Sequence, residues 1–135
     1  MKSQKEIFLD GEGDKWFNRN HEVIAKKDFS KDLITNEILD LIESSNDLKH
    51  KNKKSGLRIL EIGCGEGKRL NHLKDVYGFD CYGVEPSKKA VEIANSNGVN
   101  AKTGSADYLP FDDEYFDILI FGFCLYLCDR KDLFR

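Results

Sequence analysis

Apolar side chains follow a helical spacing in the first part of the chain. Between residues 28 and 48 they recur every three or four positions, which predicts one helix with a single buried face, capped at its start by Asp28 or Ser30. The basic tract 49–56 that follows has no aromatic residues between its charges, and we interpret it as a solvated linker. Residues 1–55 are therefore predicted to form a helical segment that precedes the main fold.

Strands and helices alternate from residue 57 onward. Short apolar runs predict strands at 57–62, 81–84, 99–102 and 116–121. Apolar residues at helical spacing predict a helix over 67–76 and a second one that begins at Pro86 and ends at Asn97-Gly98. This alternation is typical of an α/β fold with a parallel sheet, which we assign to residues 56–135.

The composition narrows the classes of partner. The 135 residues suit one domain, and 21 basic against 24 acidic side chains leave a net charge of −3, so neither nucleic acid nor a membrane surface is an expected partner. No apolar run is long enough to span a bilayer, and the N-terminus lacks a signal-peptide pattern. The four cysteines lack the paired spacing of a zinc site, so we expect buried thiols in a reducing cytoplasm and no bound metal.

A glycine-rich loop, Gly63-Cys64-Gly65-Glu66-Gly67, joins the first predicted strand to the next helix. Ligands of parallel sheets bind at the carboxyl ends of the strands, where this loop lies. A phosphate-binding P-loop would need glycine at position 62 and serine or threonine at 69, but these are Ile62 and Arg69. Lys68 replaces the last glycine of the dinucleotide fingerprint, which weakens the hypothesis of an NAD(P)-dependent oxidoreductase without excluding it.

The loop resembles motif I of the class I S-adenosylmethionine-dependent methyltransferases, which has the pattern acid-x-Gly-x-Gly-x-Gly. Every specified position of this pattern is matched here, by Glu61, Gly63, Gly65 and Gly67. Three further stretches resemble the same family in the expected order. They are the acid Glu85 after the second strand, the fourth strand, and between them residues 104–111, which end in Asp-Tyr-Leu-Pro-Phe and look like the small-Asp-x-x-Leu-Pro-Phe stretch of the family. The resemblance covers residues 57–128. It implies a Rossmann-like fold, S-adenosylmethionine as cofactor and S-adenosylhomocysteine as product.

The resemblance also implies a role for each matched residue. Glu85 would accept hydrogen bonds from both ribose hydroxyls, and Asp107, with the Ala106 backbone, would bind the adenine amino group. Glu61 would hold the amides of the loop and the amino group of the ligand. Gly65 and Gly67 would let the methionine part lie against the backbone. The other residues expected around the cofactor are Cys64, Pro86, Tyr108, and Gly122 or Phe123 after the fourth strand, with Phe123 and Tyr126 beside the sulfonium.

Residues 12–20, Glu-Gly-Asp-Lys-Trp-Phe-Asn-Arg-Asn, contain the only tryptophan of the chain. They resemble a segment of small methyltransferases of surface-polysaccharide and sugar pathways, in which the leading helices form a lid over the cofactor. Trp16 would then pack on the ligand, and Arg19 would meet its carboxylate or an acidic substrate. The alternative is that Trp16 and Phe17 hold the segment against the sheet.

The resemblance implies a sheet of seven strands, of which four are accounted for here. We therefore expect a C-terminally truncated methyltransferase, or a chain whose exposed fourth strand self-associates. The expected activity is methyl transfer to a small-molecule acceptor, and His21 is the only candidate base near the lid. A non-catalytic module that binds S-adenosylmethionine or a nucleotide is the alternative.

Overall fold

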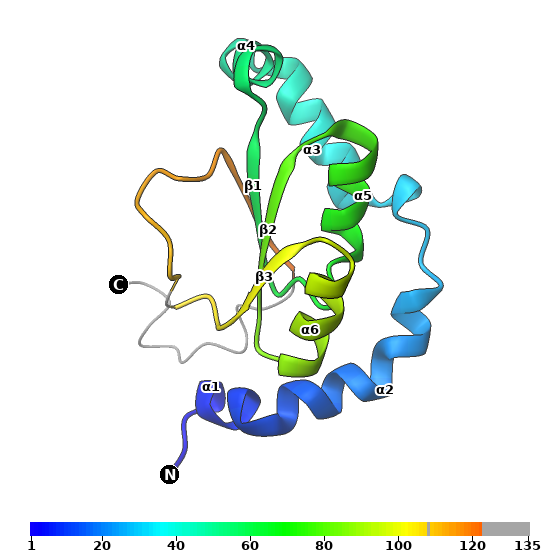
Figure 1. Ribbon diagram of the computed structural model, residues 1–135, viewed down its shortest axis with the longest axis vertical. Helices are drawn as coiled ribbons and strands as arrows, with labels where there is room; N and C mark the ends of the chain where they lie inside the picture. The colour runs from blue at the N-terminus through cyan, green and yellow to red at the C-terminus, as the bar shows by residue number, and fades with distance from the viewer. Residues whose placement is uncertain (108, 123–135) are drawn as a thin grey trace.

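The computed structural model describes residues 1–107 and 109–122, without the side chains of residues 23–25. The helical elements are α1 (Gln4–Ile7), the π-helical turn η1 (Phe8–Glu12), α2 (Gly13–Ala25), the 3-10 turn η2 (Phe29–Lys31), α3 (Leu33–Ser44), α4 (Asn46–Ser55), α5 (Lys68–Tyr77) and α6 (Lys88–Ser96) (Figure 1). The strands are β1 (Arg58–Ile62), β2 (Asp80–Glu85), β3 (Asn100–Thr103) and β4 (Ile118–Phe121).

The strands that the structure describes form one parallel sheet in the order β3-β2-β1-β4. β1 lies between two neighbours, since Leu60 pairs with Tyr82 of β2 and with Leu119 of β4. The chain order reverses beside β1, and such a switch point is where α/β sheets bind their ligands. The predicted parallel α/β fold is confirmed.

Helices α3, α5 and α6 lie along one face of this sheet (Figure 1). Their apolar side chains, including Leu70 and Leu73 of α5, pack with Ile59 of β1 in the main core. Phe111 and Phe116, from the connection between β3 and β4, pack against Leu60, Ile62 and Val84 on the opposite face. β1 is therefore buried on both sides, which explains its continuous apolar sequence.

Gly83 allows the glycine loop and α5 to approach β2 closely. A Cβ atom at this position would lie 2.5 Å from Sγ of Cys64 and 3.2 Å from Cδ1 of Leu70. Both contacts are closer than packed atoms tolerate without a shift. The absence of a side chain at Gly83 therefore contributes to the position of the loop.

The single helix predicted for residues 28–48 is wrong in its boundaries. Asp28 caps η2 by accepting a hydrogen bond from the amide of Ser30, and Asp32 starts α3 by accepting one from the amide of Thr35 at 3.0 Å. Ser45 has extended backbone angles and separates α3 from α4. Three capping side chains thus divide a region whose apolar spacing alone indicates one helix.

The prediction that residues 49–56 form a solvated linker is also wrong, because α4 continues to Ser55. Ser45 caps this helix by accepting a hydrogen bond from the amide of Leu48 at 3.2 Å, and the Leu48 side chain packs against the core. Gly56, with a φ of 79°, ends it. Leu48 is the only large apolar residue of α4, so no periodicity marks the helix in the sequence.

The start of α6 differs from the prediction by two residues. Ser87, not Pro86, defines the N-terminus, because its hydroxyl accepts a hydrogen bond from the amide of Ala90 at 3.1 Å and Lys88 is the first helical residue. Pro86 precedes the cap. The predicted left-handed end is confirmed, since Gly98 has a φ of 86°.

β4 is an outer strand among those that the structure describes. Leu119 and Phe121 of β4 are about half exposed, and with Leu33 and Leu41 of α3 they line an apolar groove of about 460 Å³. The expected self-association through this edge stays a prediction. None of the helices in the described part of the chain has the length and apolar character needed to cross a bilayer.

Candidate functional site

The glycine loop forms a tight turn at the carboxyl end of β1. Gly63, Gly65 and Gly67 have φ angles of 80°, 57° and 77°, a left-handed conformation that favours glycine. The amide of Gly63 donates to the carbonyl oxygen of Val84 at 2.7 Å, which fixes the loop to β2. A Cβ atom on Gly65 would meet no atom within 4 Å, so the space beside this backbone is open to a ligand.

Glu85 lies at the end of β2, next to the loop. Its Oε1 atom accepts a hydrogen bond from the amide of Gly65 at 3.2 Å, and its Oε2 atom accepts one from the amide of Ser87 at 2.5 Å. The two amides fix the carboxylate, while each oxygen retains a lone pair for another donor. Burial raises the pKa of Glu85 to about 7, against the effect of both amides.

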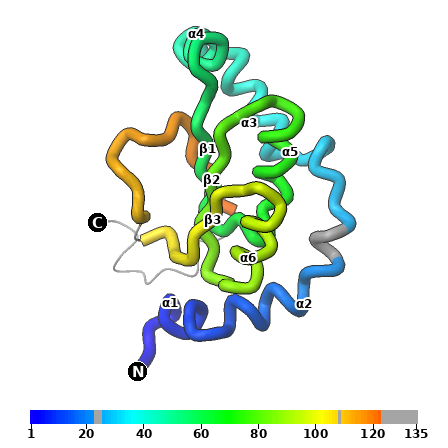
Figure 2. The backbone as a smooth tube through the Cα atoms, viewed as in Figure 1, coloured from blue at the N-terminus to red at the C-terminus, as the bar shows by residue number. Residues whose placement is uncertain are grey.

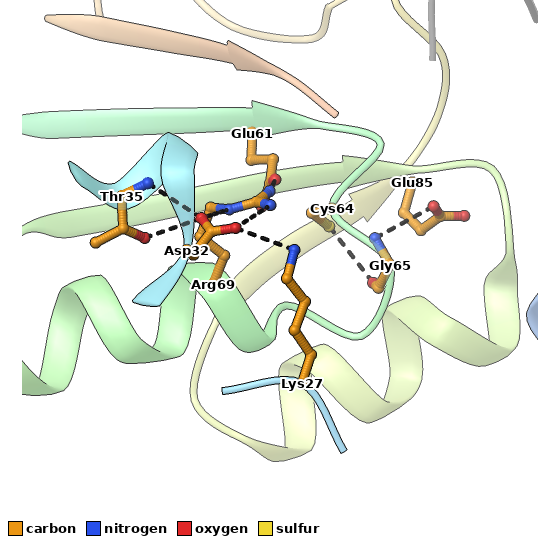
Figure 3. Close-up of polar contacts among 8 residues, drawn as sticks. All are labelled: Lys27, Asp32, Thr35, Glu61, Cys64, Gly65, Arg69 and Glu85. Carbon is orange, nitrogen blue, oxygen red and sulfur yellow. Dashed lines mark hydrogen bonds and ion pairs between the residues drawn. The ribbon is translucent and has the colours of Figure 1, made fainter. Parts of the chain in front are cut away.

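Glu61 lies beneath the loop and is 1% exposed. Its Oε2 atom accepts a hydrogen bond from Nη1 of Arg69, as Figure 3 shows. Burial raises the pKa of Glu61 to about 7 even though Arg69 opposes the shift. The expectation that Glu61 holds the loop amides needs correction, because the carboxylate that accepts the Gly65 amide is Glu85.

Arg69 connects Glu61 to the start of α3. Its Nε and Nη2 atoms donate to the two carboxylate oxygens of Asp32 at 2.7 and 3.2 Å. Nζ of Lys27 lies 3.0 Å from the same carboxylate (Figure 3). Burial disfavours ionisation of Asp32, but Arg69, Lys27 and the amide of Thr35 hold its pKa well below the ordinary value. No pattern in the sequence predicted this cluster.

Asp107 follows β3 and contacts Lys5 and Ser105. Its Oδ2 atom lies 2.8 Å from Nζ of Lys5, and its Oδ1 atom accepts a hydrogen bond from the hydroxyl of Ser105 at 2.5 Å. Burial opposes ionisation, but Lys5 and Ser105 lower the pKa of Asp107. Asp107 is therefore an anionic acceptor beside Ala106, which is partly buried.

The N-terminal segment, residues 1–22, lies across the end of the sheet where the strands have their carboxyl termini (Figure 2). It contacts the connection that follows each of the first three strands. Nδ1 of His21 lies 3.1 Å from Glu66 after β1, and Lys5 contacts Asp107 after β3. After β2, Asp14 accepts hydrogen bonds from the Ser87 hydroxyl and from the Lys89 amide. The segment therefore lies at the same edge of the sheet as the glycine loop.

The aromatic residues of the N-terminal segment differ in exposure. Phe17 is 3% exposed, whereas Trp16 is 38% exposed. Arg19 forms an ion pair with Glu12 at 2.7 Å. The roles expected for Trp16 and Arg19 toward a ligand stay predictions.

The structure brings most of the predicted site residues together. A Cβ atom on Gly122 would lie 3.0 Å from the carbonyl oxygen of Gly63 and 3.2 Å from Oε2 of Glu61, so β4 ends against the loop. Cys64 is buried beside Gly83, and Pro86 follows Glu85 in the turn that α2 covers. Tyr108, Phe123 and Tyr126 lie outside the described residues.

The sheet is parallel, the glycines of the loop after β1 have left-handed backbone angles, and a backbone amide fixes the carboxylate that follows β2. These features define a Rossmann-like class of ligand-binding protein. Residues 60–135 match the family described as the methyltransferase domain, and the chain belongs to this family. The family resemblance inferred from the sequence is thereby confirmed. A TehB-like S-adenosylmethionine-dependent methyltransferase from Corynebacterium glutamicum shares the fold, with a TM-score of 0.54 over 84% of this chain and 55% of that chain at 16% identity.

The curated relatives are similar to this chain over only part of their own length. The uncharacterized methyltransferase YcgJ of Bacillus subtilis is 36% identical over 69 residues, which is 46% of this chain and 27% of the relative. Norajmaline N-methyltransferase of Rauvolfia serpentina is 32% identical over 84 residues, which is 56% of this chain and 29% of the enzyme. The uncharacterized protein MJ1252 of Methanocaldococcus jannaschii is 33% identical over 105 residues, which is 76% of this chain and 39% of that protein. The chain thus spans less than half the length of these relatives.

Proposed function

We propose that this chain binds S-adenosylmethionine at the carboxyl ends of β1, β2 and β3 and that it serves methyl transfer to a small-molecule acceptor. The observation that carries the proposal is the geometry of Glu85. Its carboxylate is fixed by the amides of Gly65 and Ser87 beside an open glycine loop, an arrangement suited to the two hydroxyls of a ribose.

The other parts of the cofactor fit the remaining residues. Asp107 and the backbone of Ala106 would bind the adenine amino group, with Lys5 displaced from Asp107 or sharing it. Glu61 would accept the ammonium group of the methionine part. Gly65 and Gly67, with Gly122 across the loop, would allow that part to lie along the backbone.

The cofactor supplies an already activated methyl group, so the protein has to align the acceptor and exclude water. The N-terminal segment supports the second task, because it contacts all three cofactor connections. His21 is the only group here proposed as a base, and only for an acceptor that must lose a proton. A binding module without activity would share the cofactor contacts and lack turnover with every acceptor.

The affinity for S-adenosylhomocysteine should fall when the pH is lowered. Glu61 and Glu85 both have a pKa raised to about 7, so each loses its charge as the pH falls through neutrality. A protonated carboxyl is a poorer acceptor for a ribose hydroxyl and does not attract an ammonium group. Between about pH 8 and about pH 6 we expect calorimetry to show a loss of affinity of about tenfold or more.

Glu85→Gln is the control for this profile, because the amide does not titrate. The variant should bind more weakly at high pH and should lose less affinity on acidification than the wild type. An affinity of the wild-type chain that stays constant across this range would contradict the proposed roles of both carboxylates.

A further inference from the structure

We propose that Arg69, fixed in place by Asp32, is a positioning residue that keeps Glu61 charged and directed toward the ammonium group of the bound cofactor. The assignment rests on the proposed function and adds to it a residue outside the glycine motif. Arg69 would act through Glu61 and would have no contact with the adenosine part of the ligand.

The guanidinium of Arg69 is held in one orientation. Asp32 takes two of its N–H groups, at 2.7 and 3.2 Å, in the paired geometry that carboxylates form with arginine. The third nitrogen, Nη1, then donates to Oε2 of Glu61 (Figure 3). Asp32 is itself fixed, because it caps α3 through the amide and the hydroxyl of Thr35.

Burial makes Glu61 depend on this partner. The side chains of Arg69, Asp32 and Glu61 are only 11%, 3% and 2% exposed. A carboxyl group buried without a cation becomes neutral, and a neutral Glu61 would lose its attraction for an ammonium group. Arg69 opposes this loss, as the direction of its effect on the pKa of Glu61 shows.

The charged groups that act on Glu61 come from three parts of the chain. Arg69 belongs to α5, Asp32 precedes α3, and Lys27 lies between α2 and η2. Among the residues that the structure describes, the other titratable neighbours are the thiols of Cys64 and Cys81 and the carboxyl of Glu85. The two cations and the two clustered carboxylates, Asp32 and Glu61, balance, so removal of Arg69 leaves a net negative cluster that favours a protonated Glu61.

The binding of two ligands distinguishes a positioning role of Arg69 from a purely structural one. S-Adenosylhomocysteine carries the amino-acid group, whereas 5′-methylthioadenosine has the same adenine and ribose and lacks that group. Arg69→Met should weaken the binding of S-adenosylhomocysteine by about tenfold or more, a size expected for one charge-assisted contact, and should change the binding of 5′-methylthioadenosine by less than about twofold. Glu61→Gln should show the same selectivity, and the double variant should bind no more weakly than Glu61→Gln alone.

Arg69→Lys keeps the charge and provides a variant that retains the fold if Arg69→Met does not. Lysine lacks the planar fork by which two nitrogens of Arg69 bind Asp32 while the third reaches Glu61. We therefore expect a smaller loss than for Arg69→Met, about threefold, again confined to S-adenosylhomocysteine. The pH at which this affinity falls should move upward from that of the wild type. Arg58→Met is the matched control, because Arg58 is an exposed arginine at the far end of β1 and should change neither affinity.

Equal weakening of both ligands by the Arg69 variants, or unchanged binding of S-adenosylhomocysteine, would overturn the assignment. Wild-type protein that binds neither ligand would instead overturn the proposed function, and the role of Arg69 with it. Strictly additive losses in the double variant would show that Arg69 does not act through Glu61.

Discussion

Glu85→Ala should weaken the binding of S-adenosylhomocysteine by about 1–3 kcal/mol, or about five- to 150-fold in affinity. The substitution removes the carboxylate proposed to accept both ribose hydroxyls. It also frees the amides of Gly65 and Ser87, which lose their acceptor. Both effects act in the same direction, and isothermal calorimetry at about pH 8, where the carboxylate is charged, measures their sum.

Asp80→Ala is the matched control for this substitution. Asp80 is an exposed acid at the other end of the same strand, and its contacts are with Arg58 and Tyr82, away from the glycine loop. Its removal should leave the affinity within about twofold of the wild type, since surface changes of this kind have small effects. Equal affinities of the Glu85→Ala variant and the wild-type protein would contradict the ribose assignment.

Leu70→Ala should lower the free energy of unfolding by about 2–5 kcal/mol. Leu70 is fully buried on α5, and its Cδ1 atom lies close to Gly83 of β2, directly behind the glycine loop. The shorter side chain would leave a cavity that the tightly joined loop and strand cannot close. Urea denaturation followed by circular dichroism measures the change.

Leu33→Ala provides the comparison for Leu70→Ala with the same chemical change. Leu33 is 80% exposed at the start of α3, so its truncation should cost less than about 0.5 kcal/mol. A loss below about 1 kcal/mol for Leu70→Ala would show that α5 does not pack against β2 as described.

The sequence predicted the parts of the fold that local patterns encode. Short apolar runs predicted the four strands within one or two residues. The run is most continuous in β1, because a strand buried on both faces needs one. α4 was missed because it has one large apolar residue and depends on its cap, Ser45, and on the contact of Leu48 with the core. Asp32 and Ser87 are residue types that commonly cap helices, but the sequence pattern did not predict that these two positions are the caps.

The candidate site, like the fold, has a part that local sequence patterns predicted and a part that they did not. The glycine loop and Glu85 were predicted because they lie within one continuous motif and the strand next to it. The partners of the site acids come from distant parts of the chain: Asp32 is 37 residues from Arg69, and Lys5 is 102 residues from Asp107. No spacing rule joins such pairs, since only the packing of the N-terminal helices on the sheet brings them together.

The most direct test of the cofactor site is a nuclear magnetic resonance titration of the amide groups with S-adenosylhomocysteine, with NADH as the competing ligand. We predict saturable shifts for Gly63, Gly65 and Gly67 and for the residues around Glu85 and Asp107, and much weaker responses to NADH. Shifts confined to the apolar groove between α3 and β4, no shifts in folded protein, or tighter binding of NADH would contradict the proposed cofactor site.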